Sequence, residues 1–319
     1  LDSLLSVQYP TWEVIVIAGG DDGTYERALE YCEQHDKFRA VRQEPLGKNH
    51  ALNQGLALAR GEVVVVLDAD STVGENWLDN LVAPFASEAG AATGKGLPRR
   101  RTPVSSNELM QRLSANEIHH QVTLQGSASI AIRRAVLEQV GGFPEDVFVG
   151  VDWDLDARCQ AKGVQRVYCP QAVITTERPA TWREFWANEV RWRRAHLSSI
   201  LRLPETFLSS PMPALASLYI YLLAWAFLIF GMLSLIGLLF GLYLPAILWL
   251  ILLTWTLLRG IKLPVKVAAY TREGSWLSYT WVAPLLLLLT LAAIIPATLT
   301  LNRQTRQFKG ARPKPVNGK

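Results

Sequence analysis

The chain has 319 residues and a formal net charge of +4, and half of its residues are hydrophobic. This length provides for one α/β domain and a membrane region. No charged residue occurs from Thr206 to Leu258 or from Gly274 to Asn302, which excludes an ordinary soluble fold over this part of the chain. The basic residues gather beside these stretches without a nucleic-acid-binding motif, so no nucleic-acid partner is expected.

The soluble part begins with alternating strands and helices. The expected elements are strands at 12–17 and 62–67 and helices at 24–35, 47–60 and 77–85. Apolar strands without polar alternation, separated by helices, indicate an α/β fold with a mostly parallel sheet covered on both faces. Because ligands bind at the carboxyl ends of such strands, we expect the site at 18–22 and 68–70.

The second half of the soluble part is less regular. Its expected elements are strands at 129–132, 167–169 and 172–176, a turn at 141–144 and a helix at 152–162. An amphipathic helix at 181–203 carries tryptophan and arginine, which indicates a helix lying in a membrane interface. The uncharged stretches predict two crossings with a turn near 241–245, and then one more crossing.

The sequence therefore divides into four parts. They are a catalytic domain at 1–180, an interface helix at 181–205, a transmembrane region of about three helices at 206–302 and a basic tail at 303–319. The three cysteines lack metal-ligand spacing and are expected to be buried apolar residues. The protein is expected to be an integral membrane protein whose catalytic domain is cytoplasmic, because basic residues flank the spans.

Asp68 and Asp70 follow the valine-rich strand at 62–67. Two carboxylates one residue apart, where a buried strand ends, can hold Mg²⁺ or Mn²⁺ against a diphosphate. The alternative is a pair of turn or helix-capping aspartates.

Three further segments suggest chemistry, each with an ordinary alternative. Asp152 opens a helix, where a carboxylate serves as a general base or only favours the helix dipole. Arg191 and Trp192 could bind a diphosphate and a sugar, or only anchor the helix in the interface. Lys48 begins a helix, where it contacts a nucleotide phosphate or only solvent.

Six segments occur in the order of one family's motifs. They are Tyr9–Val16, Gly47–Gly55 (with Lys48, Ala51, Leu52 and Asn53), Gly61–Asp70, Gly126–Phe143 (with Gly126, Ser127, Ile132–Arg134 and Gly141–Phe143), Asp152–Arg158 and Asn188–Trp192. This set resembles the family-2 glycosyltransferases with the nucleotide-diphospho-sugar transferase fold, and it covers nearly the whole chain.

The resemblance implies roles for individual residues. Asp68 would face the nucleotide ribose and diphosphate, Asp70 would hold the metal, and Asp152 would be the catalytic base. Arg191 and Trp192 would close over the donor diphosphate and the acceptor channel, and Lys48 would lie near the nucleotide. The acceptor-side residues would be Gly126, Ser127, Asp154 and Trp192.

The sequence departs from the family pattern in four places. Ala18–Gly20 stands where the family usually has two aspartates, and Asp21 and Asp22 come later. Val151 replaces an acid, and Asn188 replaces the glutamine of the tryptophan motif. The family's first strand is absent, so the sequence is interpreted as truncated at its N-terminus.

The expected reaction is inverting transfer of a sugar from a nucleotide-diphosphate donor to a membrane-associated acceptor. A lipid acceptor is favoured, because Asn188 weakens the case for a processive synthase, and a polysaccharide or cell-wall glycan is the alternative. A membrane scaffold that keeps the fold is an alternative of another class. Three crossings after a cytoplasmic domain put the basic tail outside, whereas its charge favours the inside.

Overall fold

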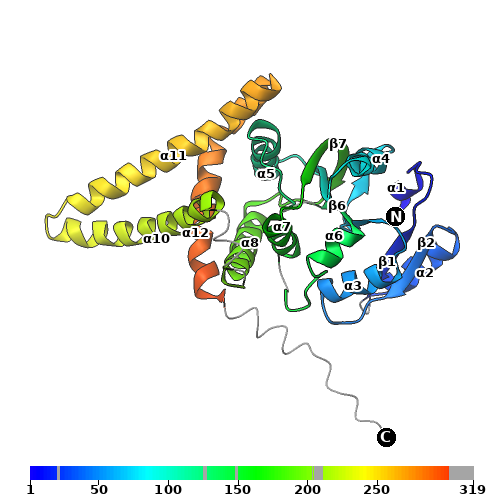
Figure 1. The fold of residues 1–319 in the computed structure, drawn as a ribbon. Helices are drawn as coiled ribbons and strands as arrows, with labels where there is room; N and C mark the ends of the chain where they lie inside the picture. The colour runs from blue at the N-terminus through cyan, green and yellow to red at the C-terminus, as the bar shows by residue number, and fades with distance from the viewer. Residues whose placement is uncertain (20–21, 125–127, 148–149, 203, 205–210, 302–319) are drawn as a thin grey trace, which may run out of the picture. The chain divides into compact units, whose positions relative to one another are not determined.

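The computed structural model describes residues 1–19, 22–124, 128–147, 150–202, 204 and 211–301 (Figure 1). Its described residues form two compact units. The first unit comprises Leu1–Leu97 and Thr123–Thr176, and the second comprises Pro98–Val122 and Glu177–Leu301.

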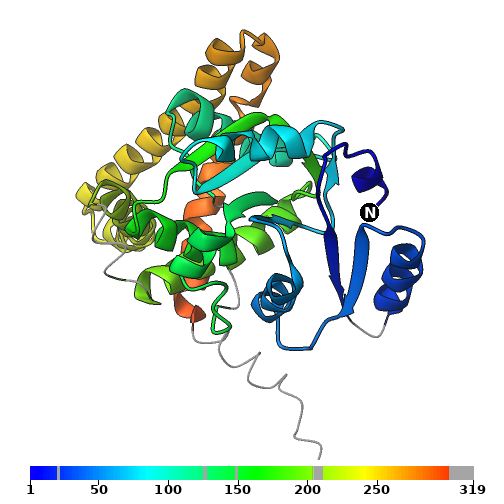
Figure 2. The ribbon, with the colours of Figure 1, turned by 45° about the vertical axis from the view of Figure 1, so that its right-hand side comes forward.

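Two sheets form the centre of the first unit (Figure 2). In the smaller sheet, β1 (Val14–Ala18) pairs in parallel with β2 (Phe38–Arg42). The larger sheet has the order β3-β6-β5-β7-β4. Its strands are β3 (Val63–Leu67), β4 (Thr72–Val73), β5 (Ala91–Pro98), β6 (Ser129–Arg133) and β7 (Arg166–Thr176).

The strand directions differ from the mostly parallel sheet that the sequence predicts. The pairs β3–β6, β4–β7 and β5–β6 are antiparallel, so the α/β fold contains a mixed sheet. Uninterrupted apolar strands require cover on both faces, and an inner antiparallel strand meets that requirement as well as a parallel one. The strands expected at 167–169 and 172–176 form one continuous strand, β7.

Helices of the first unit cover both faces of the larger sheet, and α2 packs on the smaller one. They are α1 (Asp2–Leu5), α2 (Thr24–Glu33), α3 (Lys48–Leu58), α4 (Trp77–Val82), the 3₁₀ turn η1 (Ala83–Ala86), α6 (Arg134–Gln139) and α7 (Val151–Ala161). Val63, Val65 and Leu67 pack in one apolar cluster with α4, whereas Val64 and Val66 pack in a second with α3, α6 and α7. The run of valines in β3 follows from this double burial.

The second unit is helical. It contains α5 (Pro103–Arg112), the π-helix η2 (Leu113–Ile118), α8 (Trp182–Arg202), α10 (Pro211–Leu239), α11 (Leu244–Thr271), η3 (Gly274–Tyr279) and α12 (Val282–Leu299). α5 begins at a capping box between Thr102 and Ser105. Within the described residues, α10, α11 and α12 are each long and apolar enough to cross a membrane.

α8, α10, α11 and α12 lie where the sequence predicts helices, with one extension, whereas α5, η2 and η3 were not predicted. α10 and α11 form a hairpin whose turn includes Gly241, as the sequence predicts (Figure 1). α11, however, continues past Leu258 to Thr271 and includes Arg259, Lys262 and Lys266. The helix therefore outlasts its apolar segment, because backbone hydrogen bonding does not depend on side-chain polarity.

Candidate active site

Lys48 and Asp68 meet at the end of β3. Lys48 begins α3 directly after Gly47, whose φ of 101° a side chain would strain. Its Nζ lies 2.8 Å from Oδ1 of Asp68, and the two side chains are 55% and 38% exposed. Because the pair is this exposed, it adds little stability and can rearrange around a ligand. Lys48 can contact an anionic phosphate group, whereas the carboxylate of Asp68 can approach one only through a cation.

Asp70 lies on the turn that follows β3. The amide of Ser71 donates to the carbonyl of Asp68 at 3.0 Å and closes the turn. Oδ1 of Asp70 accepts a hydrogen bond of 3.0 Å from the hydroxyl of Thr176, which is buried at the end of β7. Thr176 is a supporting residue that no sequence motif marked, since its contact depends on the order of the strands.

The Asp68–Asp70 turn suits a hard divalent cation. Mg²⁺ and Mn²⁺ are held by one or two carboxylates, with water and substrate phosphate oxygens as the other ligands. Among the described residues, no group of three or more His, Cys, Asp or Glu side chains is placed to hold a metal. Two adjacent, partly exposed carboxylates without a closed cage fit a cation that enters with a diphosphate.

Asp152 lies in the first turn of α7. The helix begins after Gly150, which has a φ of 80°, and Asp152 is half-buried there. Asp154, two residues later, is only 1% exposed and pairs with Arg158 at 2.7 Å. Arg158 also donates to the carbonyl of Val140. The pairing makes Asp154 a support for α7, whereas Asp152 is the more accessible carboxylate of the two.

Asp156 is a buried carboxylate that the sequence motifs did not single out. It is 2% exposed and accepts hydrogen bonds from Thr123 Oγ1, the amide of Leu124 and Arg166, at 2.9, 3.1 and 2.7 Å. These bonds hold the chain that leads to 125–127. Gly126 and Ser127, the predicted acceptor-side residues, lie outside the described residues. The sequence did contain a sign of Asp156, because it is the third acid in the alternating series Asp152, Asp154 and Asp156.

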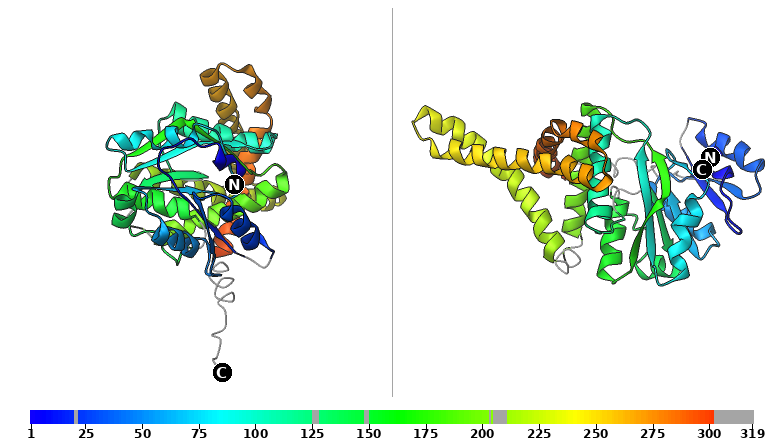
Figure 3. Two further views of the ribbon diagram at one scale, coloured as in Figure 1. Left: turned by 90° about the vertical axis from the view of Figure 1, so that its right-hand side faces the viewer. Right: turned by 90° about the horizontal axis from the view of Figure 1, so that it is seen from above.

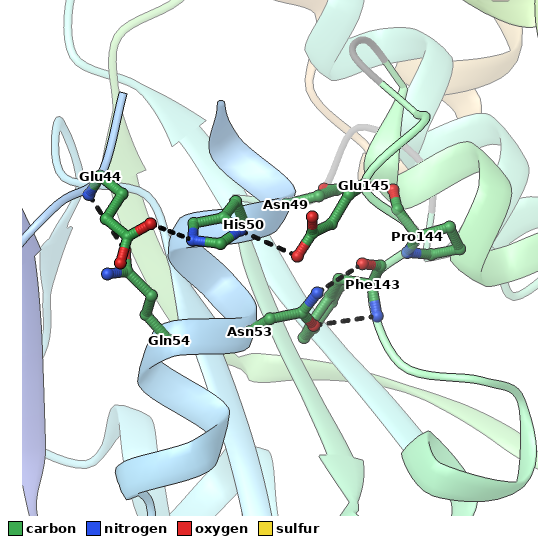
Figure 4. Close-up of polar contacts among 8 residues, drawn as sticks. All are labelled: Glu44, Asn49, His50, Asn53, Gln54, Phe143, Pro144 and Glu145. Atoms are coloured by element: carbon green, nitrogen blue, oxygen red, sulfur yellow. Dashed lines mark hydrogen bonds and ion pairs between the residues drawn. The ribbon is translucent and has the colours of Figure 1, made fainter. Parts of the chain in front are cut away.

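The first turns of α3 hold the segment 143–147, which precedes α7 in the chain (Figure 4). Asn49, 3% exposed, donates to the carbonyls of Pro144 and Val147 at 2.6 and 3.0 Å. Asn53 donates to the carbonyl of Phe143 at 2.8 Å. One helix therefore positions Lys48 at its start and fastens the chain that leads to Asp152.

His50 adds a third contact between α3 and this segment (Figure 4). Its two ring nitrogens lie 2.9 Å from Oε1 of Glu145 and 3.1 Å from Oε2 of Glu44. The amide of Glu44 donates in turn to Gln54 at 3.3 Å. These contacts link the segments before and after α3 in space, and sequence spacing gave no sign of them.

Comparison with known proteins decides the family. Residues 1–195 match the family model described as "Glycosyltransferase like family 2". The chain belongs to this family. The match spans the whole candidate site and the recognised motifs, so the resemblance seen in the sequence is confirmed.

Two curated relatives of this glycosyltransferase are similar over most of its length. The probable glycosyltransferase YdaM of Bacillus subtilis is 27% identical over 228 residues, which are 65% of this chain and 53% of the relative. The poly-beta-1,6-N-acetyl-D-glucosamine synthase of Staphylococcus epidermidis is 28% identical over 257 residues, 73% of this chain and 60% of the relative. The glycosyltransferase chain thus spans little more than half the length of these relatives.

A solved structure shows the same fold. The mannosyltransferase PcManGT from Pyrobaculum calidifontis, in complex with GDP-Man and Mn²⁺, superposes with a TM-score of 0.58 and 22% identity. The likeness covers 95% of this chain and 82% of that chain. It confirms the nucleotide-diphospho-sugar transferase fold of this glycosyltransferase.

Arg191 and Trp192 of the glycosyltransferase lie on α8 in the second unit. Arg191 is exposed, and its Nη2 donates to Oδ1 of Asn188 at 2.6 Å. Trp192 is half-buried. Asn188 therefore orients Arg191 within one turn of the same helix, so the residue that departs from the family pattern is a direct partner of the arginine.

Asp22 follows the position where the family usually shows two aspartates. Its carboxylate accepts hydrogen bonds from the amide and hydroxyl of Thr24, at 3.1 and 2.6 Å, at the start of α2. These bonds lower the pKa of Asp22, because they stabilise its charged form. Asp22 thus binds the first residue of α2, one position before the N-cap Gly23, whereas Asp21 and Gly20 lie outside the described residues.

The three cysteines are buried and unpaired, as the sequence predicts. Burial raises the pKa of both Cys159 and Cys169 to about 11. Buried thiols of high pKa are inert, which leaves them a packing role.

The arginines of the basic loop at 99–101 have partners within the second unit. Arg99 pairs with Glu177 at 2.8 Å. The guanidinium of Arg101 lies 5.5 Å from the ring centre of Trp276. Two of the three arginines therefore have partners within the protein.

Proposed function

We propose that this protein transfers a sugar from a nucleotide-diphosphate donor to a membrane-associated acceptor, with inversion at the anomeric carbon. The observation that carries the proposal is the arrangement of Lys48, Asp68 and Asp70 at the end of β3. It offers one cation and two carboxylates for a metal-bound diphosphate. A bound Mg²⁺ or Mn²⁺ would supply charge stabilisation for the departing nucleoside diphosphate.

Asp152 is the proposed general base. Its carboxylate accepts the proton of an acceptor hydroxyl while that oxygen forms a bond to the anomeric carbon. The bond between the anomeric carbon and the diphosphate breaks on the opposite face, and the nucleoside diphosphate leaves. We propose that Arg191 binds the donor diphosphate and that Trp192 closes over the donor and the acceptor. Gly126, Ser127 and Asp154 stay acceptor-side residues, Asp154 through its support of α7.

The membrane helices support an acceptor that is itself associated with the membrane. A lipid was favoured from the sequence, because Asn188 weakens the motif of processive synthases. A growing polysaccharide is the second candidate, and it is supported by the relative from Staphylococcus epidermidis, whose name is that of a polymer synthase. In either case we propose that the catalytic unit is cytoplasmic, where sugar nucleotides occur and where basic flanking residues are favoured.

The test uses membranes from cells that express the protein, with Asp152→Asn as the matched control. Labelled sugar nucleotides are supplied with Mn²⁺ or Mg²⁺, and the label is separated into organic-extractable and high-molecular-weight fractions. Asp152-dependent label in the organic phase identifies a lipid acceptor, and label in the polymer identifies a polysaccharide synthase.

A catalytically inactive scaffold would give no label in either fraction with any donor. Thermal unfolding with Mn²⁺ and a nucleoside diphosphate distinguishes this outcome from a missing acceptor. A ligand that binds only the folded protein raises its unfolding temperature. Absence of both transfer and stabilisation would contradict the proposal.

A further inference from the structure

α12 differs from the other two apolar helices in how it is covered. Half of its apolar window is buried within the protein, compared with 22% for α10 and 11% for α11. Its exposed residues form one stripe, with Trp281, Leu285, Ala292 and Leu299 separated by four, seven and seven positions. This spacing keeps them on one face of the helix. α12 therefore offers lipid a single apolar face.

The α10–α11 hairpin has the dimensions of a membrane crossing. Tyr219 and Leu239 are 20 residues apart, which corresponds to about 30 Å of helix and to the thickness of the hydrocarbon core. The guanidinium of Arg259 lies 5.5 Å from the ring centres of Tyr219 and Trp255. Aromatic and basic residues of this kind mark a membrane interface, so Tyr219 lies at the end where the chain enters the hairpin.

The first turn of α12 lies at this same end of the hairpin. A Cβ atom on Gly260 would lie 2.5 Å from the Cα of Pro284, so the backbones of α11 and α12 are in direct contact there. Gly260 follows Arg259, which faces Tyr219. The beginning of α12 is therefore level with the entrance of the hairpin.

The last turn of α12 is tied to that entrance too. Thr300, next to the end of α12, accepts a hydrogen bond of 2.6 Å from Arg194 of α8. The neighbouring Arg193 accepts through its carbonyl from the hydroxyl of Tyr221 at 3.0 Å, and His196 lies 3.2 Å from the same hydroxyl. Tyr221 is two residues from Tyr219, so both ends of α12 lie near one end of the hairpin.

The course of α12 agrees with these contacts. Figure 3 shows α12 crossing the hairpin rather than following it, and Figure 1 shows it beside α8. Phe185 of α8 packs with Val282 and Leu286 at one end, and Arg194 meets Thr300 at the other. α8 carries Glu189, Arg191, Arg193 and Arg194 between these points. A membrane-crossing α12 would take these charges into the hydrocarbon, which is costly.

We infer that α12 does not cross the membrane. Together with α8 it forms a layer on the membrane surface, and the stripe of Trp281, Leu285, Ala292 and Leu299 faces the lipid. The described chain then crosses twice, through α10 and α11. Both ends of α12 then lie on the side from which the chain enters α10. This inference does not depend on the acceptor.

The first experiment determines the side of each segment in intact cells. Green fluorescent protein, which fluoresces only inside, and alkaline phosphatase, which is active only outside, are fused separately after Lys319. Leu242→Cys in the hairpin turn and Ser275→Cys before α12 are labelled with a membrane-impermeant maleimide. The native cysteines are buried, so the unsubstituted chain is the blank. The reporter is expected on the side of Ser275. A reporter on the side of Leu242 would overturn the inference.

A second experiment compares lysines at matched positions. Ala292→Lys is exposed near the middle of α12, and Ile229→Lys is exposed near the middle of α10. A lysine in an interfacial helix reaches water with its amine, whereas one at the centre of a crossing helix does not. We expect membrane yield within about twofold of the parent for Ala292→Lys and at least tenfold loss for Ile229→Lys. Equal losses would contradict the inference.

Discussion

The first unit contains two pairs of aspartates, Asp68 with Asp70 and Asp154 with Asp156. In each pair one residue separates the two acids, but the surroundings of the pairs are opposite. Asp68 and Asp70 lie on a partly exposed turn, where their partners are Lys48 and the hydroxyl of Thr176. In α7, Asp154 and Asp156 are buried and paired with arginines at 2.7 Å. Carboxylates that stay accessible can take a ligand, whereas carboxylates neutralised inside the protein hold its structure. The same Asp-x-Asp pattern therefore serves ligand binding in one place and structural support in the other, and only the surroundings tell the two apart.

Asp152 should show the largest effect on activity, because it is the carboxylate of α7 that the buried pairs leave accessible. We expect Asp152→Asn to lower the rate of transfer by about 10²–10⁴-fold, as loss of a positioned base does. Binding of the nucleoside diphosphate, followed by thermal shift, should stay near that of the parent. Turnover within a few-fold of the parent would remove Asp152 from the proposed mechanism.

Asp154→Asn should act mainly on stability. The change leaves the half-buried Arg158 without its charge partner and should lower the free energy of unfolding by about 3–5 kcal/mol. Denaturant unfolding in detergent measures this loss. The double variant Asp154→Leu/Arg158→Leu removes both charges and should recover most of the stability. A double variant as unstable as the single one would show that the ion pair is not the cause.

Asp70→Asn should act on activity without a matching loss of stability. Removing this charge should lower kcat/KM by about 10²-fold, because the departing diphosphate loses stabilisation. Its free energy of unfolding should stay within about 0.5 kcal/mol of the parent, since the site is exposed. Asp79→Asn, an exposed acid of α4, is the control. Undiminished stabilisation by Mn²⁺ with nucleoside diphosphate would exclude Asp70 as a ligand.

His196 is a buried group in the opposite situation to Asp154 and Asp156. Its charged neighbour, Arg193, would repel the protonated form of the histidine. Burial on α8, together with Arg193, lowers the pKa of His196 to about 3. Below the unfolded pKa of about 6.5 the unfolded chain takes up a proton that the folded protein does not. The contribution of His196 to stability should therefore fall by about 1.4 kcal/mol per pH unit as the pH falls from 6.5 to about 3. Thermal unfolding of His196→Gln should show a weaker dependence, and an unchanged slope would exclude His196.

Much of the fold could be predicted from local pattern. The valine run of β3, the helix begun by Lys48 and the apolar helices were found because their periodicity depends on neighbours in the chain. The parallel pair β1–β2 agrees with the prediction, but the antiparallel pairs of the larger sheet were not predicted, since an apolar run records burial on two faces and not the direction of the next strand. β7 was divided in two because Pro170 interrupts its pattern without ending the strand.

The candidate site was predictable to a lesser degree. Motif order located Lys48, Asp68, Asp70 and Asp152, and the structure places Lys48 against Asp68, 20 residues further along the chain. It also added partners that no motif marked, such as Thr176 for Asp70 and Asn49 for the carbonyl of Pro144. These partners are separated by about 100 positions, so only the folded chain brings them together.

The sequence by itself determined the family, the position of the acidic motifs and which segments are apolar enough for a membrane. These properties depend on residue type and order, which folding does not change. Only the tertiary structure decided which aspartates are buried in ion pairs, and that both ends of α12 lie at one end of the α10–α11 hairpin. Hydropathy measures how much a helix avoids water, whereas the direction of a helix is set by the side chains packed against it.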